Sequence, residues 1–162
     1  MSDYQITLKP VYSCPASEIP HSVKLPENWL LSWHQAATLQ AIRDPNIDVI
    51  SNTAMTSDGK SLAAYLDSLQ GDCTAIGLYP TNELARDQET QIKSYIEEFQ
   101  PDPKPRLVRL SGEELEIYAE NEGLRKGAAL DSRTFNSDIL LTNPDIFHYL
   151  HRGAYLQQLL LE

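Results

Sequence analysis

Three consecutive residues, Gly59, Lys60 and Ser61, have the types and order of a phosphate-binding turn. They follow the short apolar run 47–50 and the polar stretch 51–58, and they open a segment with helical periodicity. In a strand, loop, helix context, successive backbone N–H groups and the helix N-terminus point at a phosphate. Lys60 then reaches the β and γ phosphates as the catalytic lysine, and the Ser61 hydroxyl ligates Mg²⁺. The pattern therefore predicts a nucleoside triphosphate site with Mg²⁺.

The match to the pattern G-x-x-x-x-G-K-[ST] is incomplete, because Ala54 stands at the first glycine position. A left-handed backbone at Ser57 would cost about 1–2 kcal/mol, since this residue carries a Cβ. A charge on Asp58 would repel the triphosphate by about 1 kcal/mol, at ~8 Å and an effective dielectric of ~40. Both features lower the expected affinity, and the competing interpretation is a solvated turn with a surface lysine. The residues expected around the phosphates are Thr56, Ser57, Asp58, Gly59, Lys60 and Ser61.

The elements that must position this turn alternate between strands and helices. Apolar periodicity and turn residues predict strands at 4–9, 47–50, 74–79, 106–110 and 138–142, and helices at 29–43, 60–70, 82–99, 113–124 and from 144 onward. This alternation predicts the α/β class, with a mostly parallel sheet covered by helices on both faces. Ligands of such sheets collect at the carboxyl ends of the strands. Frequent prolines separate an N-terminal strand and arm, 1–28, from the expected domain, 29–162.

Length and composition exclude several classes of protein. A chain of 162 residues and 18.3 kDa is the size of one domain with its own core. The net charge of −10 gives no basic surface of the kind that binds nucleic acid nonspecifically, so any such contact must come from local donors. There is no apolar run long enough to cross a membrane and no signal sequence. The two cysteines, Cys14 and Cys73, form no metal or disulfide pattern, which fits a cytoplasmic location.

Polar segments follow the expected strands 74–79, 106–110 and 138–142, and they read Pro80 to Gln88, Leu110 to Gly112, and Leu141 to Asp145. Together with Ala54 to Ser61, they resemble in order and spacing the first RecA-like domain of superfamily 2 helicases. Trp33-His34-Gln35 is similar to the adenine-reading segment of that family. Residues 31–39, 79–88 and 139–153 resemble more narrowly the stand-alone helicase family of type I-D CRISPR systems, Cas3-prime. The resemblance covers nearly the whole chain.

The resemblance implies an ATP-dependent DNA helicase that acts in antiviral CRISPR interference. Gln35 would then contact the adenine edge, since its amide both donates and accepts hydrogen bonds. The implied partners are single-stranded DNA, the CRISPR RNA-guided type I-D effector complex and its large HD-nuclease subunit. DNA phosphates would be met near helix N-termini by Thr81, Asn82, Arg86, Ser111, Gly112, Thr142 and Asn143.

The resemblance also implies what this stretch of sequence does not contain. The family's catalytic Asp-Glu pair is expected a few tens of residues beyond Pro144, and the sequence stops at Glu162. The second RecA-like domain, with its arginine finger, is likewise missing. Because phosphoryl transfer needs a metal-binding acid, a water-orienting group and charge stabilisation together, we expect ATP binding without hydrolysis.

Several alternatives stay open at this stage. A different class of function is a non-catalytic interaction module that docks on the effector complex, and a small kinase is disfavoured by Ala54 and by the segment 80–88. Trp29 and Trp33, four apart on one expected helix, suit a core position better than stacking on a base. His148 and His151 have the spacing of a metal pair but no third ligand. Arg86 has a competing role as the partner of Glu83 or Glu89.

Overall fold

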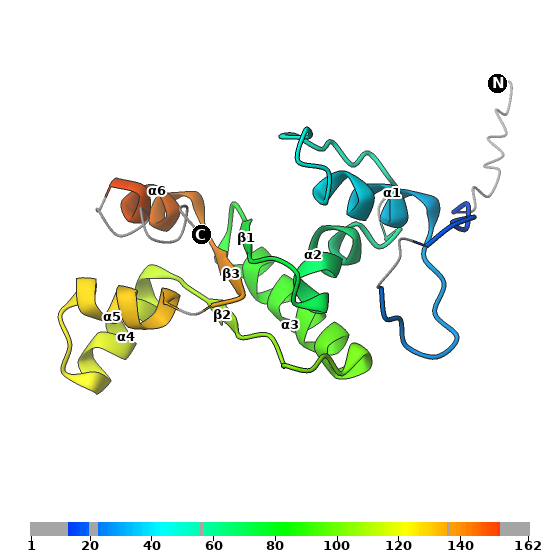
Figure 1. The fold of residues 1–162 in the computed structure, drawn as a ribbon. Coiled ribbons are helices and arrows are strands. Elements are labelled where there is room, and N and C mark those ends of the chain that lie inside the picture. Colours follow the sequence, from blue (N-terminus) through cyan, green and yellow to red (C-terminus); the bar gives the residue numbers. More distant parts are fainter. Residues whose placement is uncertain (1–12, 20–22, 56, 136, 153–162) are drawn as a thin grey trace, which may run out of the picture.

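A small parallel sheet with helices on both faces organises the chain, as Figure 1 shows for the computed structural model. The structure describes residues 13–19, 23–55, 57–135 and 137–152. The elements, in chain order, are α1 (Trp33–Ile42), α2 (Lys60–Gln70), β1 (Ala75–Leu78), α3 (Asn82–Phe99), β2 (Leu107–Arg109), α4 (Gly112–Glu122), α5 (Lys126–Thr134), β3 (Ile139–Thr142) and α6 (Pro144–Arg152). The sheet order is β1-β3-β2, and β3 pairs in parallel with both neighbours.

The central strand β3 separates two hydrophobic cores. Its residues are all buried, and alternate side chains of a strand point to opposite faces of the sheet. Ile139 and Leu141 pack into a core with α1, α2 and α3, whereas Leu140 packs with α4 and α5. In Figure 1, α1 and α2 accordingly lie on one side of the sheet, and α4 and α5 on the other. The predicted α/β class and the helical cover on both faces are therefore confirmed.

Helix α2, which follows the predicted phosphate turn, is the most deeply packed helix of the first core. Leu62, Leu66 and Leu69 are buried at the three- and four-residue steps of one helix face. The Tyr65 hydroxyl lies 2.7 Å from the Tyr79 hydroxyl just after β1, and burial raises the pKa of Tyr65. This packing fixes the direction of α2, and therefore the place of its N-terminus.

The expected strand at 47–50 is wrong. Residues 47–50 are irregular, and the side chains of Ile47, Val49 and Ile50 are 41%, 85% and 39% exposed. A strand needs a neighbour for its N–H and C=O groups, and no described segment pairs with these residues. The strand was predicted from the apolar character of 47–50 alone, and the described structure provides no neighbouring strand for these residues.

Other boundaries differ from the prediction in smaller ways. Helix α1 begins at Trp33 and not at 29, because Ser32 is an extended N-cap residue whose backbone N–H donates to Gln35 Oε1. Helix α5 was not predicted, and the strand expected at 4–9 lies outside the described residues. Helix α2 begins and ends as predicted, and Thr81 caps α3 as expected. Over the described ranges, none of the helices is both long and apolar enough to span a membrane.

Candidate functional site

The turn before α2 closes around the amine of Lys60. Its Nζ atom donates hydrogen bonds to the carbonyl oxygens of Ala54, at 2.6 Å, and Met55, at 2.9 Å. Ser57 and Gly59 both have a left-handed backbone, with φ of 67° and 75°. The strain expected at Ser57 is therefore present, and Thr56 lies outside the described residues. The geometry places the lysine ammonium group against the chain that precedes its own helix.

The N-terminus of α2 has no side-chain cap, because its N-cap residue is Gly59. The first N–H groups of a helix have no partner within the helix, and they attract anions together with the helix dipole. By contrast, Thr81 caps α3 and Ser111 caps α4 through hydroxyl oxygens that accept backbone N–H bonds. Ser61 lies in the first turn of α2, beside Lys60, where its hydroxyl suits the role expected toward Mg²⁺. This helix start can therefore receive an anion without displacing a capping side chain.

Helix α1 is tied to the same turn by two neighbouring side chains. The buried Gln35 accepts a hydrogen bond from the Ser32 backbone N–H with Oε1, and its Nε2 donates to the Gly59 carbonyl at 3.2 Å. His34 Nε2 lies 2.7 Å from the Asp58 carbonyl oxygen and 3.3 Å from its carboxylate oxygen Oδ2. Both atoms of the Gln35 amide thus bind the protein itself, so Gln35 positions the turn in this structure.

Asn52 extends this network along the chain before the turn. Its Nδ2 donates to Thr38 Oγ1 at 3.1 Å and approaches His34 Nδ1 at 3.3 Å, and its Oδ1 accepts from the Ala54 N–H. A neutral His34 ring with hydrogen on Nε2 satisfies both of its contacts. The segment before the turn is therefore held on α1 by hydrogen bonds, although it forms no strand.

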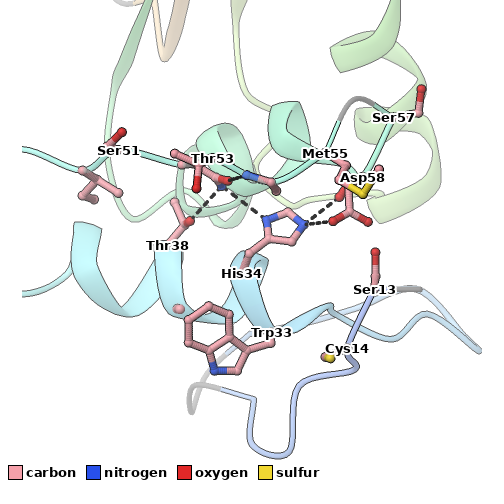
Figure 2. Close-up of a pocket in the computed structure, with 14 residues that line it drawn as sticks. Ser13, Cys14, Trp33, His34, Thr38, Ser51, Thr53, Met55, Ser57 and Asp58 are labelled. Carbon is pink, nitrogen blue, oxygen red and sulfur yellow. Dashed lines mark hydrogen bonds and ion pairs between the residues drawn. The ribbon is translucent and has the colours of Figure 1, made fainter. Parts of the chain in front are cut away.

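A pocket of about 560 Å³ opens between α1, this segment and the N-terminal arm. Figure 2 shows His34 pointing across it toward Asp58, with Trp33 leaving the same end of α1 on the side of Cys14. Within the described part of the chain, Asp58 is the one carboxylate that lines the pocket, and no lysine or arginine lines it. The lining residues are Ser13, Cys14, Trp33, His34, Ala37, Thr38, Ile50, Ser51, Asn52, Thr53, Ala54, Met55, Ser57 and Asp58. The pocket therefore ends at the turn that holds the lysine amine.

No family model, curated protein or solved structure matches this chain. The likeness to superfamily 2 helicases therefore stays an expectation drawn from the sequence.

The residues expected to meet DNA lie at the carboxyl ends of the three strands, but not all of them reach the surface. Thr142 is 1% exposed, and its hydroxyl donates to the Leu110 carbonyl at 3.0 Å. Ser111 is 4% exposed, and its hydroxyl caps α4 and contacts Glu114. These two hydroxyl groups serve the fold, whereas Gly112 stands exposed at the first position of α4.

Thr81 and Asn82, which are exposed, lie with the half-buried Asn143 where β1 and β3 end. Asn143 donates from Nδ2 to Asn82 Oδ1 at 3.3 Å, and its own Oδ1 accepts from the Ile146 N–H. This contact joins the starts of α3 and α6, beside Thr81. Hydrogen bonds from its own backbone N–H and from the Thr81 side chain lower the pKa of Glu83, and the Arg86 charge lowers this pKa further. The structure thus brings Thr81, Asn82 and Asn143 together, with Arg86 one turn further along α3.

Sequence reasoning assigned no role to His34 or Asn52. The only signal for His34 was its place beside Gln35, and Asn52 carried none, because its contacts depend on how the segment folds back on α1. Within the described ranges, no three His, Cys, Asp or Glu residues group as a metal site. His148 is exposed on α6, and the side chain of His151 lies outside the described set.

Proposed function

We propose that this chain binds ATP with Mg²⁺ at the turn 54–61, as the RecA-like first motor domain of an ATP-dependent DNA helicase in type I-D CRISPR interference. The observation that carries the proposal is the Lys60 amine, held inside a turn with a left-handed Gly59 directly before an uncapped helix. A triphosphate would exchange the two carbonyl partners of this amine for anionic oxygens. The ammonium group would then face opposite charge, whereas the two carbonyl oxygens offer only their dipoles.

A Mg²⁺ ion at a nucleotide site needs few ligands from the protein. In nucleotide sites it keeps several waters and binds phosphate oxygens, with one or two protein oxygens. We assign this role to the Ser61 hydroxyl, because Ser61 lies in the first turn of α2 beside Lys60. The ion would neutralise phosphate charge beside Asp58.

The proposal assigns binding, and not hydrolysis, to these residues. Hydrolysis needs a metal-binding acid and a group that orients water. Asp58 is the one carboxylate that the described residues contribute to the pocket, and it faces His34. DNA would meet Thr81, Asn82 and Asn143, since these polar side chains stand at helix starts beside one another.

Titration calorimetry with MgATP tests the proposal. We expect Lys60→Ala to weaken MgATP binding by at least tenfold, because a hydrogen bond to a charged group contributes about 1.5–3 kcal/mol. Lys60→Met controls for the loss of side-chain packing, and Lys104→Ala is the matched control, since Lys104 is an exposed lysine in the loop after α3. Circular dichroism checks that each variant folds. Equal affinity of Lys60→Ala and the parent chain would refute the proposal.

A non-catalytic docking module is the second candidate. It is favoured by the exposed apolar side chains of the segment 47–50 and by Ile76 and Leu78 on the edge strand β1. The effector complex would then cover these side chains. If the parent chain does not bind MgATP at millimolar concentration, this second candidate replaces the first.

A further inference from the structure

Trp29, which precedes α1, and Trp33, the first residue of α1, have opposite surroundings. Trp29 packs edge-on against Tyr95 and Phe99, with ring centroids 6.4 and 5.3 Å apart. Trp33 is 65% exposed and lines the pocket next to the turn. An indole ring of this kind buries little apolar area on folding, so its packing contributes little to the stability of the domain. Its position at a pocket instead offers a flat aromatic face to a ligand.

The charges around the pocket favour a neutral ligand group. Among the lining residues that the structure describes, Asp58 is the one carboxylate, and none is a lysine or an arginine. A phosphate group placed there would be repelled by Asp58 and would find no permanently charged cation. The Lys60 amine instead contacts the carbonyl oxygens of Ala54 and Met55, which stand where the pocket meets the turn. A ligand with a charged end at Lys60 would therefore place an uncharged end in the pocket.

The polar side chains that could read the edge of a base are already engaged. Gln35 uses Oε1 and Nε2 in bonds to Ser32 and Gly59. Asn52 uses both amide atoms in bonds to Thr38, His34 and Ala54. The contacts that the pocket still offers to a base are therefore mainly apolar. Ile50 and Met55, which are 39% and 59% exposed, also line the pocket and add to its apolar surface.

We infer that the Trp33 indole is the platform on which the nucleobase of the bound nucleotide stacks, while Gln35 positions the turn and does not read the base. This inference rests on the proposed function, because it places the phosphates at Lys60. The volume of about 560 Å³ leaves room for a purine. Stacking on an aromatic ring tolerates different bases, since every base has a π face.

Two ligands separate the base from the phosphates. MgATP carries both, and magnesium tripolyphosphate carries the phosphates alone. We expect Trp33→Ala to weaken MgATP binding roughly tenfold, which is about 1.4 kcal/mol, and to leave tripolyphosphate binding unchanged. Trp33→Phe keeps a stacking face and should retain most of the MgATP affinity. Titration calorimetry measures all three variants with both ligands.

Fluorescence gives an independent readout. In Trp29→Phe, the emission comes from Trp33 alone, so MgATP should quench it and tripolyphosphate should not. In Trp33→Phe, the emission comes from the packed Trp29 and should not respond to either ligand.

The outcomes are distinct. MgATP binding that is unaffected by Trp33→Ala, but weakened by Lys60→Ala, overturns the inference and leaves the proposed function standing. Equal weakening of both ligands by Trp33→Ala also overturns it, because the ring would then act through the turn. A parent chain that binds neither ligand overturns the proposed function and the inference together.

Discussion

Gly59 and Gly71 stand at the two ends of α2, and comparing an alanine at each isolates the contact between the turn and α1. Both residues have a left-handed backbone, with φ of 75° and 81°. A Cβ at Gly71 would meet no atom within 4 Å, whereas a Cβ at Gly59 would collide with Gln35 Nε2. The Gln35 amide is buried and held at Oε1 by Ser32, so it cannot move aside without losing its bonds.

The magnitudes follow from these surroundings. An alanine in a left-handed conformation destabilises the folded state by about 1–2 kcal/mol. Replacing glycine by alanine also reduces the conformational entropy of the unfolded chain, and this effect offsets about 0.4–1 kcal/mol of that loss. We therefore expect Gly71→Ala to lower the free energy of unfolding by about 1 kcal/mol. Gly59→Ala should lower the free energy of unfolding by about 1–2 kcal/mol more. This substitution also breaks the hydrogen bond from Gln35 and leaves the buried Gln35 amide without that acceptor.

Urea denaturation followed by circular dichroism measures both values, and a double-mutant cycle with Gln35→Ala tests the cause. Once Gln35 is shortened, Gly59→Ala should cost no more than Gly71→Ala, since nothing remains for the Cβ to meet. Equal destabilisation by the two glycine substitutions in the parent chain would refute the reasoning. So would a Gly59→Ala cost that Gln35→Ala leaves unchanged.

Four further outcomes are expected elsewhere in the fold. Gly77→Ala should destabilise by about 2–4 kcal/mol or abolish folding, because its Cβ would collide with the Tyr65 hydroxyl between packed side chains; thermal unfolding measures this. The Arg109 guanidinium forms an ion pair with Glu89, at 2.6 Å, and a second one with a carboxylate on α4. Arg109→Ala should therefore lower the free energy of unfolding at pH 7, measured by urea denaturation, by about 1–3 kcal/mol. A loss below about 0.5 kcal/mol would contradict this expectation. Burial opposes the ionisation of Glu89, but the hydrogen bonds from its cationic partners outweigh it and lower its pKa; the stability they supply is therefore present above the ordinary carboxyl pKa and should fall as the pH drops through the lowered one. Burial raises the pKa of the Cys73 thiol, so at pH 8 a thiol reagent should label the exposed Cys14 first and Cys73 more slowly, and equal rates in the folded chain would exclude this.

The sequence predicted best the elements with strong local signals. Helix α2 was found at its true bounds because three leucines repeat on one face and Gly71 ends it. The strands β1, β2 and β3 were predicted to within two residues, since each is short, apolar and bounded by polar or proline residues. Helix α5 was missed, because it has few apolar residues, such as Ala129 and Leu130, and these do not repeat at helical spacing.

The site was predictable in its backbone and not in its side-chain partners. A left-handed Ser57 and a lysine next to a helix start follow from local order along the chain. How α1 lies across the turn decides the side-chain partners. It determines that the Gln35 amide donates to Gly59, and that Trp33 faces solvent while Trp29 is packed. Contacts between residues some 20 positions apart leave no periodic trace in a single sequence.

The arm before residue 29 has a practical consequence for cutting this protein into parts. The Trp33 backbone N–H, at the exposed start of α1, donates to the Cys14 carbonyl at 2.7 Å, and Ala16 donates to Leu31 at 2.8 Å. The Lys24 backbone and the Gln70 side chain also exchange two hydrogen bonds at the far end of α2. A shortened polypeptide starting at Trp29 would therefore lose one wall of the pocket and the acceptor that satisfies the first turn of α1. Dissection at that boundary would remove part of the ligand site together with the arm.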